Sequence, residues 1–185
     1  MLSVKDFLPF TNTPQVPNAV ALVELWSPVD DVHGALLKAV RSASTSLVIA
    51  MFGFDDDQLA TAVKEKLANP NVFVQLSLDV SQAGGVHEQE ILVRENYPAS
   101  MIAVGHSEKG AIMHLKLAIV DGFATIRGST NWSGSAETLQ DNYMSIMLDP
   151  FVAAGARTRC DVIHTEMLAY QAKKAIPLGP STQHG

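Results

Sequence analysis

The stretch IMHLKLAIVDGFATIRGSTN, residues 112–131, sets the main expectation for the fold. Two runs rich in apolar residues flank Asp121-Gly122, a dipeptide typical of tight turns between antiparallel strands. The pattern therefore predicts a hairpin with strands over 112–120 and 123–127.

Polar side chains interrupt the first strand of this hairpin. Residues two apart on a strand point to the same face, so His114 and Lys116 should project together, opposite Leu115 and Leu117. An imidazole and an ammonium on an apolar strand are costly to bury unless an anion satisfies them. The hairpin should bring the segment 128–131 back beside them, which predicts a phosphate-binding site.

The rest of the chain alternates predicted strands and helices. Strands are expected over 20–26, 47–54, 72–78, 101–104 and 143–148, and helices over 30–42, 55–67, 86–95 and 150–174. This order predicts an α/β fold with a mixed β-sheet sandwiched between helices, in one domain over residues 1–185. Residues 1–19 should form an extended, partly disordered lead-in, and residues 177–185 a frayed tail.

Three consecutive acids, Asp55-Asp56-Asp57, follow the apolar run 47–54. They allow a magnesium site, but acids also suit the positive end of a helix, and we favour helix capping.

Composition limits the classes of function. The formal net charge of −6 argues against a broadly basic, nucleic-acid-coating surface, although a local phosphate site remains compatible with it. The longest apolar run, residues 47–54, is too short to span a bilayer, and no secretory signal is visible. Cys160 is the only cysteine, which excludes an internal disulfide. We therefore expect a cytoplasmic protein without membrane association.

The pattern His114-x-Lys116-x4-Asp121-x6-Gly128-Ser129-x-Asn131 resembles the HKD motif of the phospholipase D superfamily, with every fixed position matched. By its size and its single copy of the motif, the chain is most similar to the small bacterial endonucleases of that superfamily. The resemblance implies a phospholipase D-like fold and phosphoryl-transfer chemistry.

The resemblance also implies roles for the motif residues. In the family, two histidines share the reaction: one becomes a phosphohistidine and the other protonates the leaving group. This chain carries one His-x-Lys, so the second histidine should come from a second copy, which predicts a homodimer. Lys116, Asn131 and Ser129 should hold the phosphate oxygens, while Asp121 and Gly128 should be structural.

The family places an acid about ten residues after the asparagine, where it orients the histidine. Asp141 takes this role in our prediction, and Glu137 is the alternative. Two further residues are candidates for substrate binding. Lys109 belongs either to a solvent loop or to the rim of the site, and Trp132 either stacks on the substrate or packs in the core.

The predicted function is metal-independent phosphodiester hydrolysis of nucleic acid, DNA more than RNA, without a cofactor. Two alternatives stay open. The same chemistry suits a phospholipid substrate, and some superfamily relatives serve as non-catalytic nucleic-acid-binding modules.

Overall fold

The computed structural model describes residues 1–15, 21–82 and 100–174. The helix predicted over 86–95 and the tail predicted over 177–185 therefore lie outside the described residues. Within the described ranges, seven strands form one mixed sheet: β1 (Leu22–Ser27), β2 (Ser46–Met51), β4 (Phe73–Asp79), β5 (Ile102–Gly105), β6 (Lys116–Val120), β7 (Ala124–Gly128) and β9 (Asn142–Leu148).

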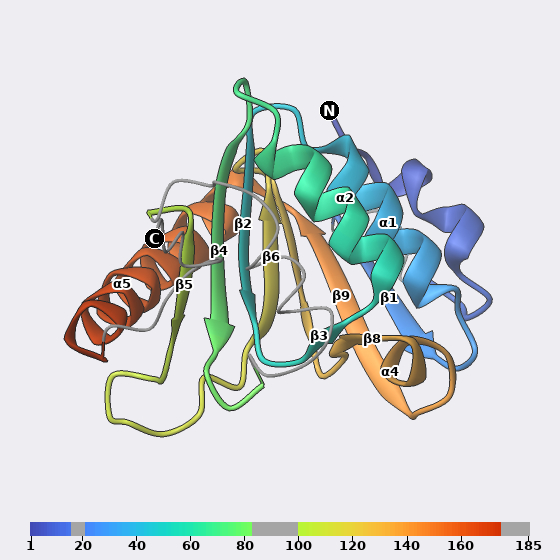
Figure 1. Cartoon of the computed structure of the whole chain (residues 1–185). Coiled ribbons are helices and arrows are strands. Elements are labelled where there is room, and N and C mark those ends of the chain that lie inside the picture. The colour runs from blue at the N-terminus through green and yellow to red at the C-terminus, as the bar shows by residue number, and fades with distance from the viewer. Residues whose placement is uncertain (16–20, 83–99, 175–185) are drawn as a thin grey trace.

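The strand order is β1-β9-β7-β6-β2-β4-β5 (Figure 1). The first five strands in this order pair antiparallel, whereas β2, β4 and β5 run parallel to one another. The predicted hairpin is β6–β7, and its turn has positive φ at Asp121 (53°) and Gly122 (61°). An L-residue rarely adopts positive φ, and Asp is among the few that tolerate it, so the sequence suits this turn.

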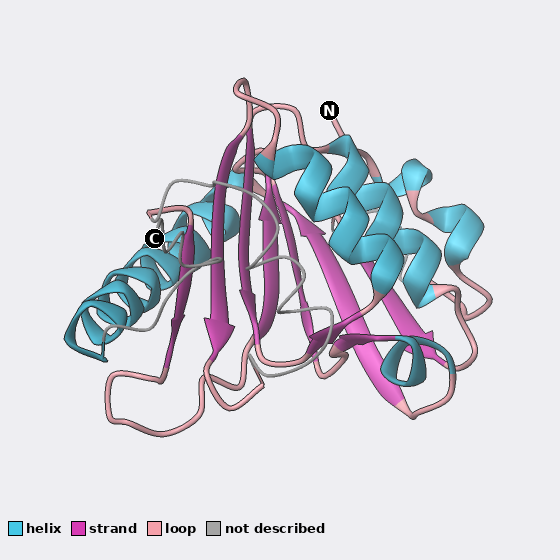
Figure 2. Cartoon of the chain, in the orientation of Figure 1, coloured by secondary structure: helices cyan, strands magenta, loops and turns pink. Residues whose placement is uncertain are grey.

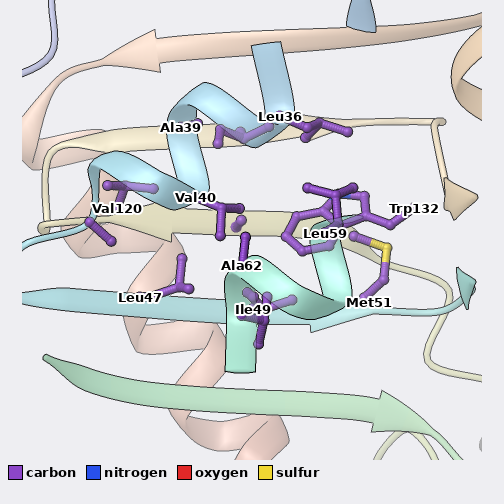
Figure 3. Packing of buried hydrophobic residues seen from close by; sticks show 14 of the residues in the cluster. Leu36, Ala39, Val40, Leu47, Ile49, Met51, Leu59, Ala62, Val120 and Trp132 are labelled. Carbon is purple, nitrogen blue, oxygen red and sulfur yellow. The ribbon is translucent and has the colours of Figure 1, made fainter. Parts of the chain in front are cut away.

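Helices cover both faces of the sheet, as predicted (Figure 2). Helices α1 (Val32–Ser42) and α2 (Asp57–Leu67) lie on one face, over the core in Figure 3, which includes Leu36, Leu59 and Ile49. The long helix α5 (Pro150–Lys174) covers the other face. None of the helices in the described part of the chain combines the length and the apolar character needed to cross a bilayer.

The acid run after β2 caps a helix. Asp56 is the N-cap of α2, and its Oδ1 accepts a hydrogen bond from the Leu59 amide at 2.7 Å. This contact confirms the helix-capping interpretation, because a side-chain oxygen at the N-cap satisfies a free amide of the first turn.

The strand predicted over 47–54 is shorter than expected. β2 ends at Met51, and Phe54-Asp55 forms a separate strand, β3, which pairs parallel with β8 (Trp132–Ser133). A short helix, α4 (Gly134–Thr138), follows β8. The apolar run continues past Met51 because Phe54 packs edge-on against Trp132 in the core, with the ring centroids 5.1 Å apart.

The prediction of a loose lead-in is wrong for residues 1–15. Two 3-10 helices, η1 (Val4–Asp6) and η2 (Leu8–Phe10), place Phe7 in the core with no exposed surface. Thr13 then donates to the buried Asp30 carboxylate through its amide (2.9 Å) and its hydroxyl (2.8 Å). These anchors offset the entropy cost of ordering the segment.

Candidate active site

The ring of Phe52, directly after β2, lies between the two polar side chains of the motif strand. It meets the His114 ring edge-on, with centroids 4.5 Å apart, and the Lys116 Nζ stands 4.7 Å from its centroid. The Phe52 amide also donates to the Leu115 carbonyl at 2.8 Å. His114 and Lys116 therefore come together as predicted, around an aromatic residue that was read from the sequence as part of a strand.

His114 lies outside the strand that was predicted to carry it. β6 begins only at Lys116, and the preceding residues are held by a different contact: the Met113 amide donates to the buried Asp79 carboxylate at 2.6 Å. This bond takes the place of backbone pairing between strands at Met113. The Met113 side chain is buried, whereas the His114 side chain is exposed. The imidazole is accessible to a substrate.

Lys116 is buried, with 8 % of its surface exposed. Its Nζ donates to the His114 carbonyl at 3.0 Å, and burial lowers the pKa of the ammonium. No carboxylate forms an ion pair with it among the described residues. A desolvated cation without a counter-ion attracts an anion such as phosphate.

Asn131 follows β7, the second strand of the hairpin. It lies beside Gly53, where an added Cβ would be 3.1 Å from the carboxamide carbon. Its Oδ1 is buried and has no hydrogen-bond partner within the described ranges. Phe52 contacts His114 and Lys116, and Gly53 lies against Asn131. The Phe52-Gly53 dipeptide is therefore next to all three polar side chains.

Gly128 and Ser129 brace the hairpin against β9. A Cβ at Gly128 would lie 2.1 Å from the Tyr143 carbonyl oxygen, so only glycine fits, as the structural assignment predicted. The Ser129 hydroxyl donates to Asn142 Oδ1 at 2.8 Å and accepts from the Tyr143 amide at 3.1 Å. Its predicted role as a phosphate donor therefore requires it to exchange the Asn142 bond.

Asp121 braces the turn, as predicted. Its carboxylate accepts hydrogen bonds from the amides of Ser44, Thr45 and Ser46 and from two hydroxyls of the same loop. Burial opposes ionisation, but these donors prevail and lower the pKa of Asp121 to about 2. The residue joins the α1–β2 loop to the hairpin.

The two candidates for the orienting acid lie in different surroundings. Asp141 is exposed beside Ser129, Trp26 and Tyr143, and makes no hydrogen bond to His114 among the described residues. Glu137 is buried, and its Oε2 lies 2.6 Å from His33 Nδ1. Among the described residues Glu137 thus contacts another histidine, and which acid orients His114 stays a prediction.

The two candidates for substrate binding, Trp132 and Lys109, differ in their exposure to solvent. Trp132 is 2 % exposed and packs against Phe54, so core packing is confirmed and stacking on a substrate is excluded. Lys109 is exposed in a tight turn, where the Gly110 amide donates to the Ser107 carbonyl. Its role at the rim stays a prediction.

With the fold and the site described, the comparison with known families identifies the class. Residues 36–161 match the model described as cardiolipin synthase, PLD-like domain. This match covers more than half of the chain, and it contains all the residues of the HKD motif. The chain therefore belongs to the phospholipase D superfamily of phosphodiesterases, as its motif indicates.

The chain is similar to mitochondrial cardiolipin hydrolases. It is 32% identical over 125 residues to that of Chlamydomonas reinhardtii, which covers 68% of this chain and 54% of the relative. Identity to that of Homo sapiens is 33% over 113 residues, or 61% of this chain and 42% of the relative. The chain thus spans about half the length of these relatives.

Solved structures share the fold. NucT from Helicobacter pylori superposes with a TM-score of 0.65 at 23% identity, covering 80% of this chain and 95% of that one. Nuc from Salmonella typhimurium, a phospholipase D family member, gives 0.60 at 22% identity, covering 76% and 91%. Both confirm the predicted fold class.

Proposed function

We propose that this chain works as a homodimeric phosphodiesterase that cleaves nucleic acid through a phosphohistidine, without a metal ion in the chemistry. One observation carries the proposal. The single His-x-Lys of the chain presents an exposed imidazole beside a buried ammonium, and Asn131 adds a buried carboxamide oxygen. Among the described residues the ammonium has no ion-pair partner and the oxygen has no hydrogen-bond partner. This set can bind and attack a phosphate, but it contains one of the two histidines that the reaction needs.

The proposed steps balance with two imidazoles. A ring nitrogen of His114 bonds to phosphorus while the bond to the leaving oxygen breaks, and that oxygen takes a proton from the second copy's histidine. Water then gives a proton to this second histidine, its oxygen bonds to phosphorus, and the P–N bond breaks. Lys116 and Asn131 stabilise the charge on the non-bridging oxygens. One ring cannot stand on both sides of phosphorus at once, so a second chain is needed.

Nucleic acid is the proposed substrate because the single HKD motif resembles that of the small bacterial endonucleases of the superfamily. The fold is also shared with Nuc and NucT. The relatives named mitochondrial cardiolipin hydrolases point to a second class of substrate. A phospholipid is the second candidate, favoured by the names of those relatives and by two exposed apolar side chains that flank His114: Ile112 is 50% exposed and Leu115 is 37% exposed.

A substrate panel tests the proposal. Single- and double-stranded DNA, RNA and cardiolipin vesicles are incubated with the chain in EDTA, beside His114→Ala and the matched control His106→Gln, a histidine packed against Tyr170 of α5. We expect cleavage of nucleic acid in wild type and control, none in His114→Ala, and a phosphate trapped on His114 after rapid quenching. Cardiolipin hydrolysis alone would select the second candidate. Binding without turnover would leave a nucleic-acid-binding module.

The shared site has a separate test. Wild-type chains are mixed with equal amounts of His114→Ala chains and allowed to exchange subunits. If both histidines are required, only dimers of two wild-type chains work, and the activity falls to about a quarter of that of an unmixed wild-type sample at the same total chain concentration. A fall to about half, or full activity from a strictly monomeric chain, contradicts the two-histidine mechanism.

A further inference from the structure

A second cluster of titratable side chains lies apart from the His114 site. It joins three elements: His33 from α1, Asp56 at the start of α2, and Glu137 from α4. The His33 Nδ1 lies 2.6 Å from Glu137 Oε2 and 3.3 Å from Asp56 Oδ2. One donor atom from each residue falls within 4.8 Å of the other two. His33 and Glu137 are 104 positions apart in the chain, so the three residues come together only in the folded protein.

The charges of this cluster do not balance. Two carboxylates face one imidazole, so a neutral imidazole leaves two negative charges in the cluster and a protonated one still leaves a single negative charge. The Glu137 side chain has no exposed surface and that of Asp56 is 11% exposed. An uncompensated buried charge is costly, and a second positive charge would remove that cost.

We propose that His33, Asp56 and Glu137 bind a divalent transition-metal ion, and that zinc fits them best. Imidazole nitrogen and carboxylate oxygen are zinc ligands, and tetrahedral geometry with bonds of about 2.0 Å separates two ligand atoms by about 3.3 Å. The contact between His33 and Asp56 already has this length. A divalent ion held by a neutral imidazole and two carboxylates brings the cluster to zero net charge.

The surroundings prepare one ligand for this role. While Oδ2 of Asp56 faces His33, its Oδ1 accepts from the Leu59 amide at 2.7 Å. Hydrogen bonds of this kind fix the orientation of a ligand before the metal arrives. The His33 side chain is 21% exposed, which leaves a side from which an ion and a water ligand can enter.

The proposed ion is structural and stands outside the phosphate chemistry. It links α4, and through it β8 and the neighbouring Asn131, to the first turns of α1 and α2. Without the ion, the hydrogen bond between His33 and Glu137 still closes the cluster. Chelation should therefore lower the stability of the fold while the EDTA-treated protein keeps its cleavage activity. This site does not depend on the proposed function.

Calorimetric titration of the chelator-stripped full chain with Zn²⁺ tests the site. We expect one ion per chain, with affinity at least about 100-fold lower in His33→Gln and in Glu137→Gln, since loss of even an outer-shell partner costs about 10- to 100-fold. His114→Ala and His106→Gln serve as matched histidine controls and should bind as wild type does. Affinity should rise with pH, because the ligand atoms bind an ion only when they carry no proton.

Two measurements on the wild-type chain keep the test independent of how the variants fold. Co²⁺ should give the visible absorption of a nitrogen- and oxygen-ligated ion, and Zn²⁺ should raise the unfolding midpoint by mass action. No saturable Zn²⁺ binding, binding unchanged in both ligand variants, or binding lost only in His114→Ala would each overturn the proposal. The last result would place the ion between the motif histidines instead.

Discussion

Asp121 gives a prediction whose size follows from the structure. Its carboxylate accepts from three consecutive backbone amides, which lower its pKa from 3.8 to about 2. A shift of this size corresponds to about 2.4 kcal/mol at neutral pH, and solvent screening of a partly exposed group reduces it to about 1–2 kcal/mol. Asp121→Asn tolerates the positive φ but lacks the charge and one acceptor, so it should lose about this much stability.

The pH dependence separates this charge effect from a general disturbance of the turn. A carboxyl group with a depressed folded-state pKa stabilises the fold above its unfolded pKa of 3.8, and the effect disappears as the pH falls toward 2. Urea unfolding of wild type and Asp121→Asn should therefore differ most at pH 7 and by about half as much at pH 3. An equal difference at both pH values would refute the reasoning, because it would show that the carboxylate charge contributes nothing.

Three further substitutions test the site. Gly128→Ala should destabilise the chain by about 3 kcal/mol or more in thermal unfolding, since its Cβ meets a backbone oxygen of β9 at 2.1 Å. Gly155→Ala in α5 is the matched control. It has open space around the added Cβ and should be neutral or stabilising. Phe52→Leu should keep the fold but lower single-turnover cleavage about tenfold to 100-fold, because the ring that aligns His114 with its neighbour is lost. Lys116→Met should abolish cleavage and raise the denaturation midpoint slightly; a lower midpoint would contradict our account of its burial.

The parts of the site that the sequence predicted are local in the chain. The turn at Asp121-Gly122 and the closeness of His114 and Lys116 depend on neighbours within a few positions, so the local sequence is enough to predict them. The order of strands and helices was predictable for the same reason. Even here the start of the strand was missed, because the bond from Met113 to Asp79 spans 34 residues and β6 begins only at Lys116.

The parts that escaped prediction are contacts between distant segments. Phe52 looked like the end of a buried strand, and only the fold shows that its ring contacts the motif. The contact of Glu137 with His33 was not predicted, because His33 lies 104 positions earlier in the chain. Gly53, inside the apolar run 47–54 and directly after Phe52, was the available signal that the strand ends and the backbone makes a close approach.

The burial of Lys116 and the exposure of His114 suit two different roles in the proposed site, binding of the phosphate and reaction with it. The ammonium is desolvated in the folded chain before any substrate binds, which lowers the stability of the fold. Binding of an anion then stabilises the ammonium without further desolvation of it. In the proposed mechanism the imidazole needs the opposite setting, because it forms and breaks a bond to phosphorus and meets a second histidine on the far side. An exposed imidazole over a buried cation is thus the arrangement expected of half an active site, in which one chain fixes the phosphate and leaves its reacting face open to a second copy.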